Sequence, residues 1–521
     1  MYRTLTFLRH TLLLASCLLA ALSGTANNIQ VANASLAGNN SISAFAFVQF
    51  DVSWENSWKG NGMNNWDAAW IFAKVRTTNG IWQHVQFNNT GHTAPTGSQI
   101  DLGLLTPGTA FNATTNPVIG TYLLRSAEGT GTFNATGVQL RWNYGLQGLN
   151  YADIAEVRVF AIEMVYVPQG AFAAGSGGTE TLAFTLTTIN TANATTAPSG
   201  TGGLGGQAGG FPTGHTAPTS AGWPNGFNAF YCMKYEVTQQ GFVDFFNTLT
   251  YTQQDNLTNP SNAAGSAVFS GGGGFRNGVR IQTPGVASTT PAVSACNLNG
   301  NTIYGEATDG KDIACNEMSW NAFTAYLDWS GLRPMTELEY EKACRGTAAP
   351  VPNEYPWGTT AIAISAYTLA NAGAPDEGIA TNYSTTAGNA TNLTTTPFLG
   401  PINGPVRVGI FAANVSNSGR VSAGASYYGI MELGGNVWER SVTIANADGR
   451  AFTGTHGNGA LGASGIADVA TWPSFSTASG AGFRGGAWGD GTTPVSHRGN
   501  ASFATPSATS SYGGRGVRLA P

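Results

Sequence analysis

The feature that most constrains the fold is a period-two alternation of apolar and polar side chains in the first third of the chain. Residues 43–54 read Ser-Ala-Phe-Ala-Phe-Val-Gln-Phe-Asp-Val-Ser-Trp, a pattern typical of a strand with one buried face. Asn79-Gly80, between two such segments, indicates a hairpin turn. Several short strands at this spacing predict a β-sandwich over residues 27–160. The other segments of this kind cover residues 70–76, 82–87, 120–125 and 137–142.

A cluster of tryptophans in the same region has two interpretations. Exposed indole rings would make a platform for a carbohydrate, whereas buried rings would form a packed aromatic core. We favour the packed core as the more common arrangement. The tryptophans are Trp54, Trp58, Trp66, Trp70 and Trp82.

The N-terminus has the pattern of a secretory signal. Basic residues precede an apolar run from Leu12 to Leu22, and small residues lead up to Ala26. We therefore expect residues 1–26 to be a signal peptide and the protein to be secreted or at the cell surface. The apolar run is short for a transmembrane helix, and no later stretch reaches about 20 apolar residues, so no transmembrane segment is expected. A lipid anchor at Cys17 is the alternative to secretion.

The composition narrows the class of partner. Charged residues make up 10% of the chain and the formal net charge is −5, whereas ordinary soluble domains contain about 25% charged residues. This balance gives no electrostatic reason to expect nucleic acid or an anionic membrane as a partner. The polar surface must come from uncharged side chains and from the 70 glycines, which suits extracellular proteins and close-packed assemblies.

The second region, residues 161–521, reads as loops and short strands with few helices. Residues 194–223 are rich in Gly, Pro, Ser and Thr and predict a long surface loop. Thr336 and Glu339 form a capping box, and Gly346 is a natural helix stop. The expected helices cover residues 239–249, 321–329 and 336–346.

Cysteine usage agrees with export but predicts no metal cluster. Four cysteines follow the signal, without a Cys-x-x-Cys pair or a histidine at zinc-ligand spacing. Cys296 and Cys315 lie in one loop-rich stretch and could pair. Cys232 and Cys344 fall on a predicted strand and a predicted helix, where buried free thiols are the more common state.

Three segments of the second region carry motifs. Residues 332–346 read Leu-Arg-Pro-Met-Thr-Glu-Leu-Glu-Tyr-Glu-Lys-Ala-Cys-Arg-Gly, residues 428–439 read Tyr-Gly-Ile-Met-Glu-Leu-Gly-Gly-Asn-Val-Trp-Glu, and residues 483–488 read Phe-Arg-Gly-Gly-Ala-Trp. In this order they resemble the formylglycine-generating enzyme, or sulfatase-modifying factor, family, a variant of the C-type lectin fold. The predicted fold is therefore α+β: an all-β sandwich-like domain followed by a loop-rich, C-type-lectin-like domain over residues 161–521.

The chain departs from the family where the family's chemistry resides. Active members carry a pair of copper-binding cysteines shortly after the motif that ends here at Trp488. In this chain residues 489–494 read Gly-Asp-Gly-Thr-Thr-Pro, and no cysteine follows Cys344. Without thiolates there is no soft ligand for copper. We therefore expect no copper and assign no catalytic residue.

The resemblance also implies a calcium site of backbone and carboxylate oxygens, the ligands that Ca²⁺ requires. The alternative is that Glu439 pairs with an arginine and Trp438 packs in the core. Asn371 matches a second family site. The residues matching the first site are Glu432, Gly435, Val437 and Glu439.

By resemblance, the fold also offers a loop-built ligand groove. The residues expected to line it are Trp438, Arg484, Trp488, His497, Arg498 and Arg518. The function we favour is a non-catalytic surface protein, self-assembling or ligand-binding, whose partner is itself or an extracellular glycan or peptide. The alternatives are an enzyme of the same superfamily with unassigned chemistry and an accessory envelope lipoprotein.

Overall fold

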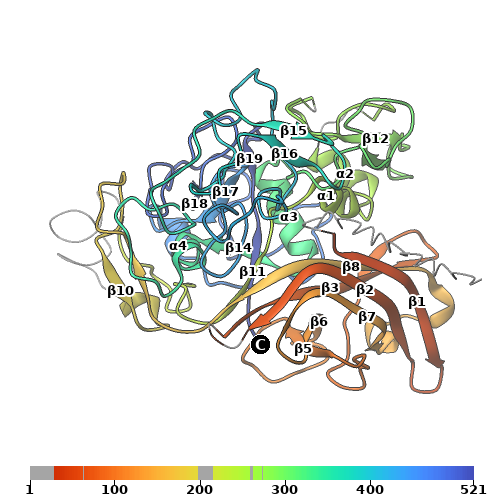
Figure 1. The fold of residues 1–521 in the computed structure, drawn as a ribbon. Helices are drawn as coiled ribbons and strands as arrows, with labels where there is room; N and C mark the ends of the chain where they lie inside the picture. Colours follow the sequence, from red (N-terminus) through yellow and green to blue (C-terminus); the bar gives the residue numbers. More distant parts are fainter. Residues whose placement is uncertain (1–27, 61, 63, 197–214, 259–261, 273) are drawn as a thin grey trace, which may run out of the picture.

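The computed structural model describes residues 28–60, 62, 64–196, 215–258, 262–272 and 274–521. The predicted signal and most of the predicted loop over residues 194–223 lie outside these ranges. The described chain is mostly β, with five α-helices and one 14-stranded sheet. In Figure 1 the strands of the first region lie below the helices and loops of the second.

Two layers of strands build the first region. One contains β1 (Gln30–Asn40), β2 (Phe45–Gly60) and β7 (Gly129–Trp142), with β2 antiparallel to both neighbours. The other contains β3 (Asn65–Thr77), β4 (Trp82–His84), β5 (Ser98–Leu104), β6 (Val118–Arg125) and β8 (Ile154–Val167). Alternate residues of β2, including Val48, Phe50 and Trp54, share a core with β3, β6 and β7, as the period-two pattern predicts.

Strand β3 is buried on both faces. Ile71 and Val75 belong to the core of the first region, whereas Trp70 and Phe72 belong to a larger core that includes Trp329 of the second region. A strand buried on both faces carries a continuous apolar run, as residues 68–73 do. The two regions therefore share a core.

The sheet also continues from one region into the other. Its main path is β1-β2-β3-β8-β11-β20-β14-β17-β18. β8 pairs with β3 and, near its end, with β11. The boundary predicted between residues 160 and 161 therefore falls inside a paired strand.

The strands of the second region are short. Those of the large sheet are β11 (Phe230–Met233), β14 (Arg333–Thr336), β17 (Trp438–Val442), β18 (Ala481–Arg484), β19 (Tyr512–Gly513) and β20 (Gly516–Leu519). Three two-stranded sheets consist of β9 (Phe172–Ala174) with β10 (Thr187–Ile189), β12 (Val279–Thr283) with β13 (Val293–Cys296), and β15 (Thr368–Ala370) with β16 (Gly378–Thr381).

The helices follow their capping residues. The predicted capping box of Thr336 and Glu339 is present at the start of α4 (Glu337–Arg345), and Gly346 ends that helix. The helix predicted over residues 239–249 is shorter, because the hydroxyl of Thr250 caps a second helix. The other helices are α1 (Gln239–Phe246), α2 (Tyr251–Leu257), α3 (Trp320–Trp329) and α5 (Ala447–Arg450).

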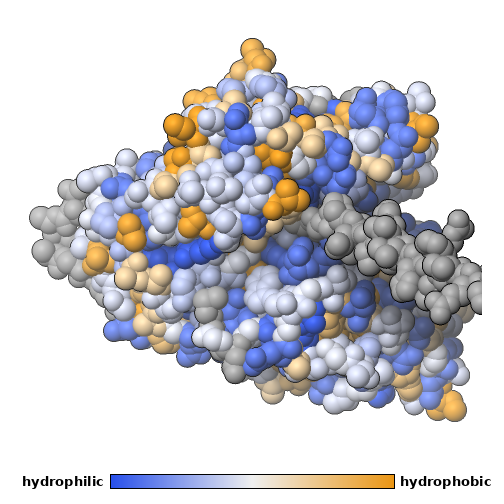
Figure 2. Space-filling model, in the orientation of Figure 1, coloured by the Kyte–Doolittle hydropathy of each residue, from blue (hydrophilic) through white to orange (hydrophobic). Residues whose placement is uncertain are grey.

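The tryptophan cluster divides between core and surface. Trp54 and Trp70 are buried, in agreement with the packed-core interpretation, whereas Trp58, Trp66 and Trp82 are half-buried. On the face drawn in Figure 2, hydrophobic residues are scattered among polar ones. None of the described helices combines the length and the apolarity that crossing a bilayer requires.

Candidate functional site

The motif strands β17 and β18 form the centre of the candidate site. They pair antiparallel, with Glu439 opposite Arg484. After β18 the chain turns back at Gly486, whose φ of 91° suits glycine. A Cβ there would lie 2.1 Å from the carbonyl oxygen of Gly491. The turn returns Trp488 to the interior, where its indole N–H donates to the carbonyl of Ser510 at 2.9 Å.

Two of the predicted groove arginines are buried against one carboxylate. Arg498 donates to both oxygens of Glu337, at 2.6 and 2.9 Å, and Arg484 donates to the same group at 3.1 Å. Burial alone would raise the pKa of Glu337, but Arg498 and Arg484 lower it to about 2. Arg484 also pairs with Glu341 at 2.9 Å. These arginines hold the start of α4 against β18.

The predicted groove residues Arg484, Arg498 and Arg518 do not line an open ligand groove, because all three are buried. Arg518 is also buried: it donates to the carbonyls of Gly331 and Leu104, and it lies 4.6 Å from the ring centroid of Trp70. Trp488 is buried and His497 is half-buried. The arginines are enclosed because buried carboxylates and carbonyls accept their N–H groups, so they are unavailable to a ligand.

Trp438 is only 7% exposed and packs with Phe483 and Ala487, which is the core arrangement weighed as the alternative, and its remaining edge lines a pocket. Its indole N–H donates to the Asp490 carboxylate at 2.8 Å, and Asp490 belongs to the segment where the resemblance would place the copper ligands. The pocket has a volume of about 320 Å³. Its walls are aromatic, amide and hydroxyl groups, with one carboxylate. The lining residues are Trp438, Phe483, Asp490, Asn500, Phe503, Thr509, Ser510, Ser511 and Tyr512.

All four described cysteines are buried free thiols. The pairing considered for Cys296 and Cys315 does not form. Burial raises the pKa of Cys344 to about 12, and it also raises the pKa of the other three thiols. Because the thiolate is the reactive form, these groups are inert at neutral pH.

A cluster of buried carboxylates surrounds the positions matched to calcium. Glu439 pairs with Arg515 at 2.5 Å, which is the alternative weighed for this residue. Glu432 accepts from the backbone N–H of Gly409 at 2.9 Å. Among the described residues, the second oxygen of Glu432 and that of Glu439 have no hydrogen-bond partner.

Sequence reasoning missed a third carboxylate, that of Glu236. It accepts from the side chain of Asn436 at 2.5 Å and from the backbone N–H of Val437 at 3.0 Å. Burial raises the pKa of Glu236, Glu432 and Glu439, and that of Glu432 reaches about 7. No nearby sequence pattern marks Glu236, because it lies 200 residues from Asn436.

The cluster of Glu236, Glu432 and Glu439 fits a hard cation, but Arg515 competes with such a cation for Glu439. Two unpartnered buried carboxylate oxygens favour a cation, whereas Arg515 already supplies one positive charge to Glu439. No set of three or more His, Cys, Asp or Glu side chains in the described ranges has metal-site geometry, so calcium there would need backbone carbonyls. At the second position, Asn371 donates to Asp376 at 2.8 Å in an exposed loop. Calcium stays a prediction at both positions.

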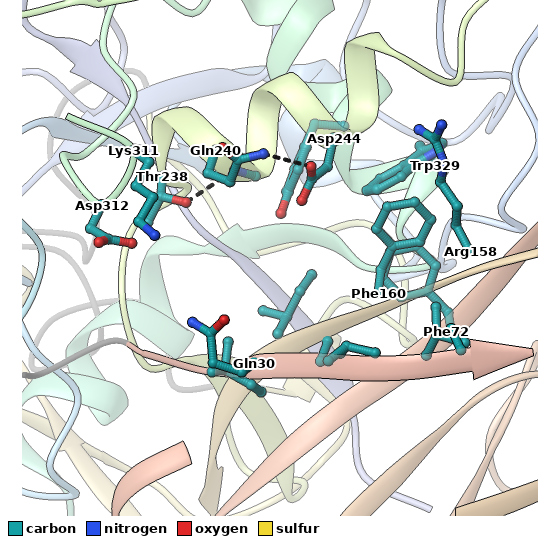
Figure 3. A pocket seen from close by; sticks show the side chains of 18 of the residues that line it. Gln30, Phe72, Arg158, Phe160, Thr238, Gln240, Asp244, Lys311, Asp312 and Trp329 are labelled. Atoms are coloured by element: carbon teal, nitrogen blue, oxygen red, sulfur yellow. Dashed lines mark hydrogen bonds between the residues drawn. The ribbon is translucent and has the colours of Figure 1, made fainter. Parts of the chain in front are cut away.

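A larger cleft lies elsewhere, between β1, β8 and α1, with a volume of about 650 Å³. Figure 3 shows Asp244 beside Gln240, whose side chain donates to it at 2.8 Å, and the rings of Phe160 and Trp329 near it. Burial raises the pKa of both Asp244 and Asp312 to about 6. The cleft joins residues from Ile29 to Trp329, so no local sequence pattern indicates it.

These observations define a β-rich protein whose motif strands carry buried ion pairs beside an aromatic surface pocket. The sequence profile of the sulfatase-modifying factor enzyme 1-like domain matches residues 152–520. The chain belongs to this FGE-sulfatase family, which confirms the resemblance.

Comparisons with curated proteins and with solved structures assign no function to the chain. No curated protein matches the chain. A solved structure, titled "Major Tropism Determinant U1 Variant", is similar with 11% sequence identity and a TM-score of 0.25. The match covers 94% of this chain and 87% of that chain. A likeness at this level supports no inference about function.

Proposed function

We propose that this protein is an exported, non-catalytic, ligand-binding member of its family, in which the Trp438 pocket receives the ligand. The observation that carries the proposal is the pocket itself. It presents aromatic faces together with amide and hydroxyl groups, beside the segment where the resemblance implies metal chemistry. Small sites of this kind, with apolar walls and a few polar groups, are typical of recognition.

The surrounding groups support recognition over catalysis. The segment after Trp488 supplies no thiol, and the four buried thiols elsewhere have raised pKa values. Arg484 and Arg498 hold Glu337 rather than an open site. The groups left at the pocket suit stacking and hydrogen bonding.

The Trp438→Ala variant is expected to weaken ligand binding at least tenfold. Loss of the indole removes one wall of the pocket and the N–H that positions Asp490. A tenfold loss corresponds to about 1.4 kcal/mol. The measurement is a titration against whichever glycan or peptide the native protein retains on a mixed array.

Trp82→Ala is the matched control, because Trp82 is a half-buried tryptophan outside this pocket. Ligand binding that survives Trp438→Ala, or an array that retains no native protein, would overturn the proposal.

If the protein is exported, we expect the mature chain to begin at Asn27. The arrangement of basic, apolar and small residues before that position supports cleavage after Ala26. Mass spectrometry of protein recovered from the medium checks it. A chain that begins at a lipid-modified Cys17 would replace secretion with membrane anchoring, and an intact Met1 would argue against export.

We also propose that calcium binds at the Glu432 cluster. The support is the pair of unpartnered, buried carboxylate oxygens on Glu432 and Glu439. Three carboxylates there outnumber the two arginines, Arg515 and Arg407, that lower the pKa of Glu432.

A further inference from the structure

A second aromatic pocket lies where the two regions meet. It has a volume of about 540 Å³ and combines residues of β2 with the loop over residues 412–431. It shares no lining residue with the Trp438 pocket. Its aromatic walls are Trp58, Tyr235, Tyr427 and Tyr428, and its other lining residues include Asn56, Lys234, Arg420 and Met431.

The two half-buried rings are fixed before any ligand arrives. The indole N–H of Trp58 donates to Asn65 at 2.9 Å. The ring of Tyr427 packs over Gly346, where an added Cβ would lie 2.1 Å from the ring, and its backbone N–H donates to the carbonyl of Cys344 at 2.9 Å. Rings held in this way lose little conformational freedom on binding.

The positive charges that line the pocket are already engaged. Lys234 pairs with Glu163 at 2.9 Å and lies 3.6 Å from Asp67. Arg420 donates to the carbonyl oxygens of Pro356 at 2.8 Å and Ala425 at 3.3 Å. A cationic ligand would find no carboxylate among the lining residues, and an anionic ligand would have to displace the hydrogen bonds that hold Lys234 and Arg420. The pocket therefore suits an uncharged ligand.

Two polar groups remain available at the pocket. Asn56 is exposed and has a φ of 53°, at a register shift between Trp54 and Ser57 in the pairing of β2 with β7. Such bulges redirect a side chain. The other group is the hydroxyl of Tyr427, which accepts from the Thr347 hydroxyl at 3.3 Å and keeps its own proton to donate. The pocket thus offers rings together with an amide and a hydroxyl.

We propose that this pocket binds an uncharged saccharide ring. A sugar ring has an apolar C–H face, which packs on aromatic rings, and a rim of hydroxyls, which bonds to amides and phenols. The pocket supplies both sets of groups, and its two cations are already held by other hydrogen bonds. Trp58 is therefore the tryptophan of the N-terminal cluster that serves recognition, while Trp54 and Trp70 serve the core.

The test uses the full secreted chain and four neutral probes: cellohexaose, maltohexaose, mannohexaose and hexa-N-acetylchitohexaose. Isothermal titration is expected to show saturable binding of at least one probe. Trp58→Ala and Tyr427→Ala are expected to weaken that binding at least tenfold, and Asn56→Ala several-fold. Asn56 is exposed, so its variant leaves the core unchanged at the modest cost of placing alanine at a positive φ, and it reports on the pocket even if a ring variant unfolds.

Trp82→Ala is the matched control and should bind the probe as the native chain does, because Trp82 lines neither aromatic pocket. The Trp58→Ala and Asn56→Ala losses report on this pocket alone, so failure of the Trp438 proposal would leave this result intact. The saccharide proposal is overturned if none of the four probes binds, if binding survives Trp58→Ala and Asn56→Ala, or if only an uncharged aromatic peptide competes for the pocket.

Discussion

Replacing Glu337 by glutamine is expected to lower the free energy of unfolding by about 3–5 kcal/mol, the usual cost of leaving a buried charge without its partner. The carboxylate accepts from Arg484 and Arg498, from the Thr443 hydroxyl at 3.0 Å and from the backbone N–H of Ile444 at 2.8 Å. The amide keeps the shape but leaves Arg498 without a carboxylate and Arg484 with Glu341 alone. Urea unfolding monitored by circular dichroism measures the loss.

Glu156→Gln is the matched control. Glu156 also accepts from two arginines, Arg76 and Arg158, but its side chain is 30% exposed and theirs are about 40% exposed. Surface pairs of this kind contribute up to about 1 kcal/mol. Equal losses from the two variants would contradict the view that burial makes the Glu337 cluster decisive.

The direction of the Glu337 pKa shift determines how the stability contributed by this cluster depends on pH. The pKa of Glu337 is lowered to about 2, so its stabilising effect is present above the ordinary glutamate pKa of about 4.3. It is lost as the pH falls towards 2. The Glu337→Gln variant should therefore lose part of the native protein's acid-induced destabilisation.

Stability at the Glu432 cluster is expected to change in the opposite direction with pH. The pKa of Glu432 is raised to about 7, so the folded protein holds a proton that the unfolded chain releases at about pH 4.3. This contribution is complete at low pH and is lost as the pH rises through 7, by about 3 kcal/mol. A bound calcium ion would replace the proton and restore stability at high pH.

Thermal unfolding at pH 5 and pH 8, in calcium and in chelator, tests both the loss of stability at high pH and its restoration by calcium. Calcium should raise the melting temperature at pH 8 and leave it unchanged at pH 5. Glu432→Gln should remove most of the pH effect and most of the calcium effect, because glutamine carries no charge that a proton or a calcium ion could neutralise. Identical melting curves in calcium and in chelator at pH 8 would exclude calcium from this cluster.

Much of the local structure could be predicted from the sequence. The alternation in β2 and the capping box at Thr336 both appear as expected, because each depends on neighbours within a few residues. The three ordered motifs indicated the family, which the match over residues 152–520 confirms. The break between α1 and α2 was missed, although the cap at Thr250 that causes it is visible in the sequence.

The candidate site was harder to predict, because its character depends on partners far apart in the chain. The sequence places Arg484 in the third motif but does not show that Glu337, 147 residues earlier, pairs with it in the interior. Similarly, nothing near Trp438 indicates that Asp490 accepts its N–H.

The sequence by itself determined several strands of the first region, the capping box at Thr336, the family and the absence of thiols after Cys344, because these depend on residue identity and short-range periodicity. Only the tertiary structure decided which charges are buried and which rings face an opening. It joined β3 to the second region's core, enclosed the motif arginines, and brought Trp58 beside Tyr427. The physical reason is that burial is set by long-range packing, which no local pattern records.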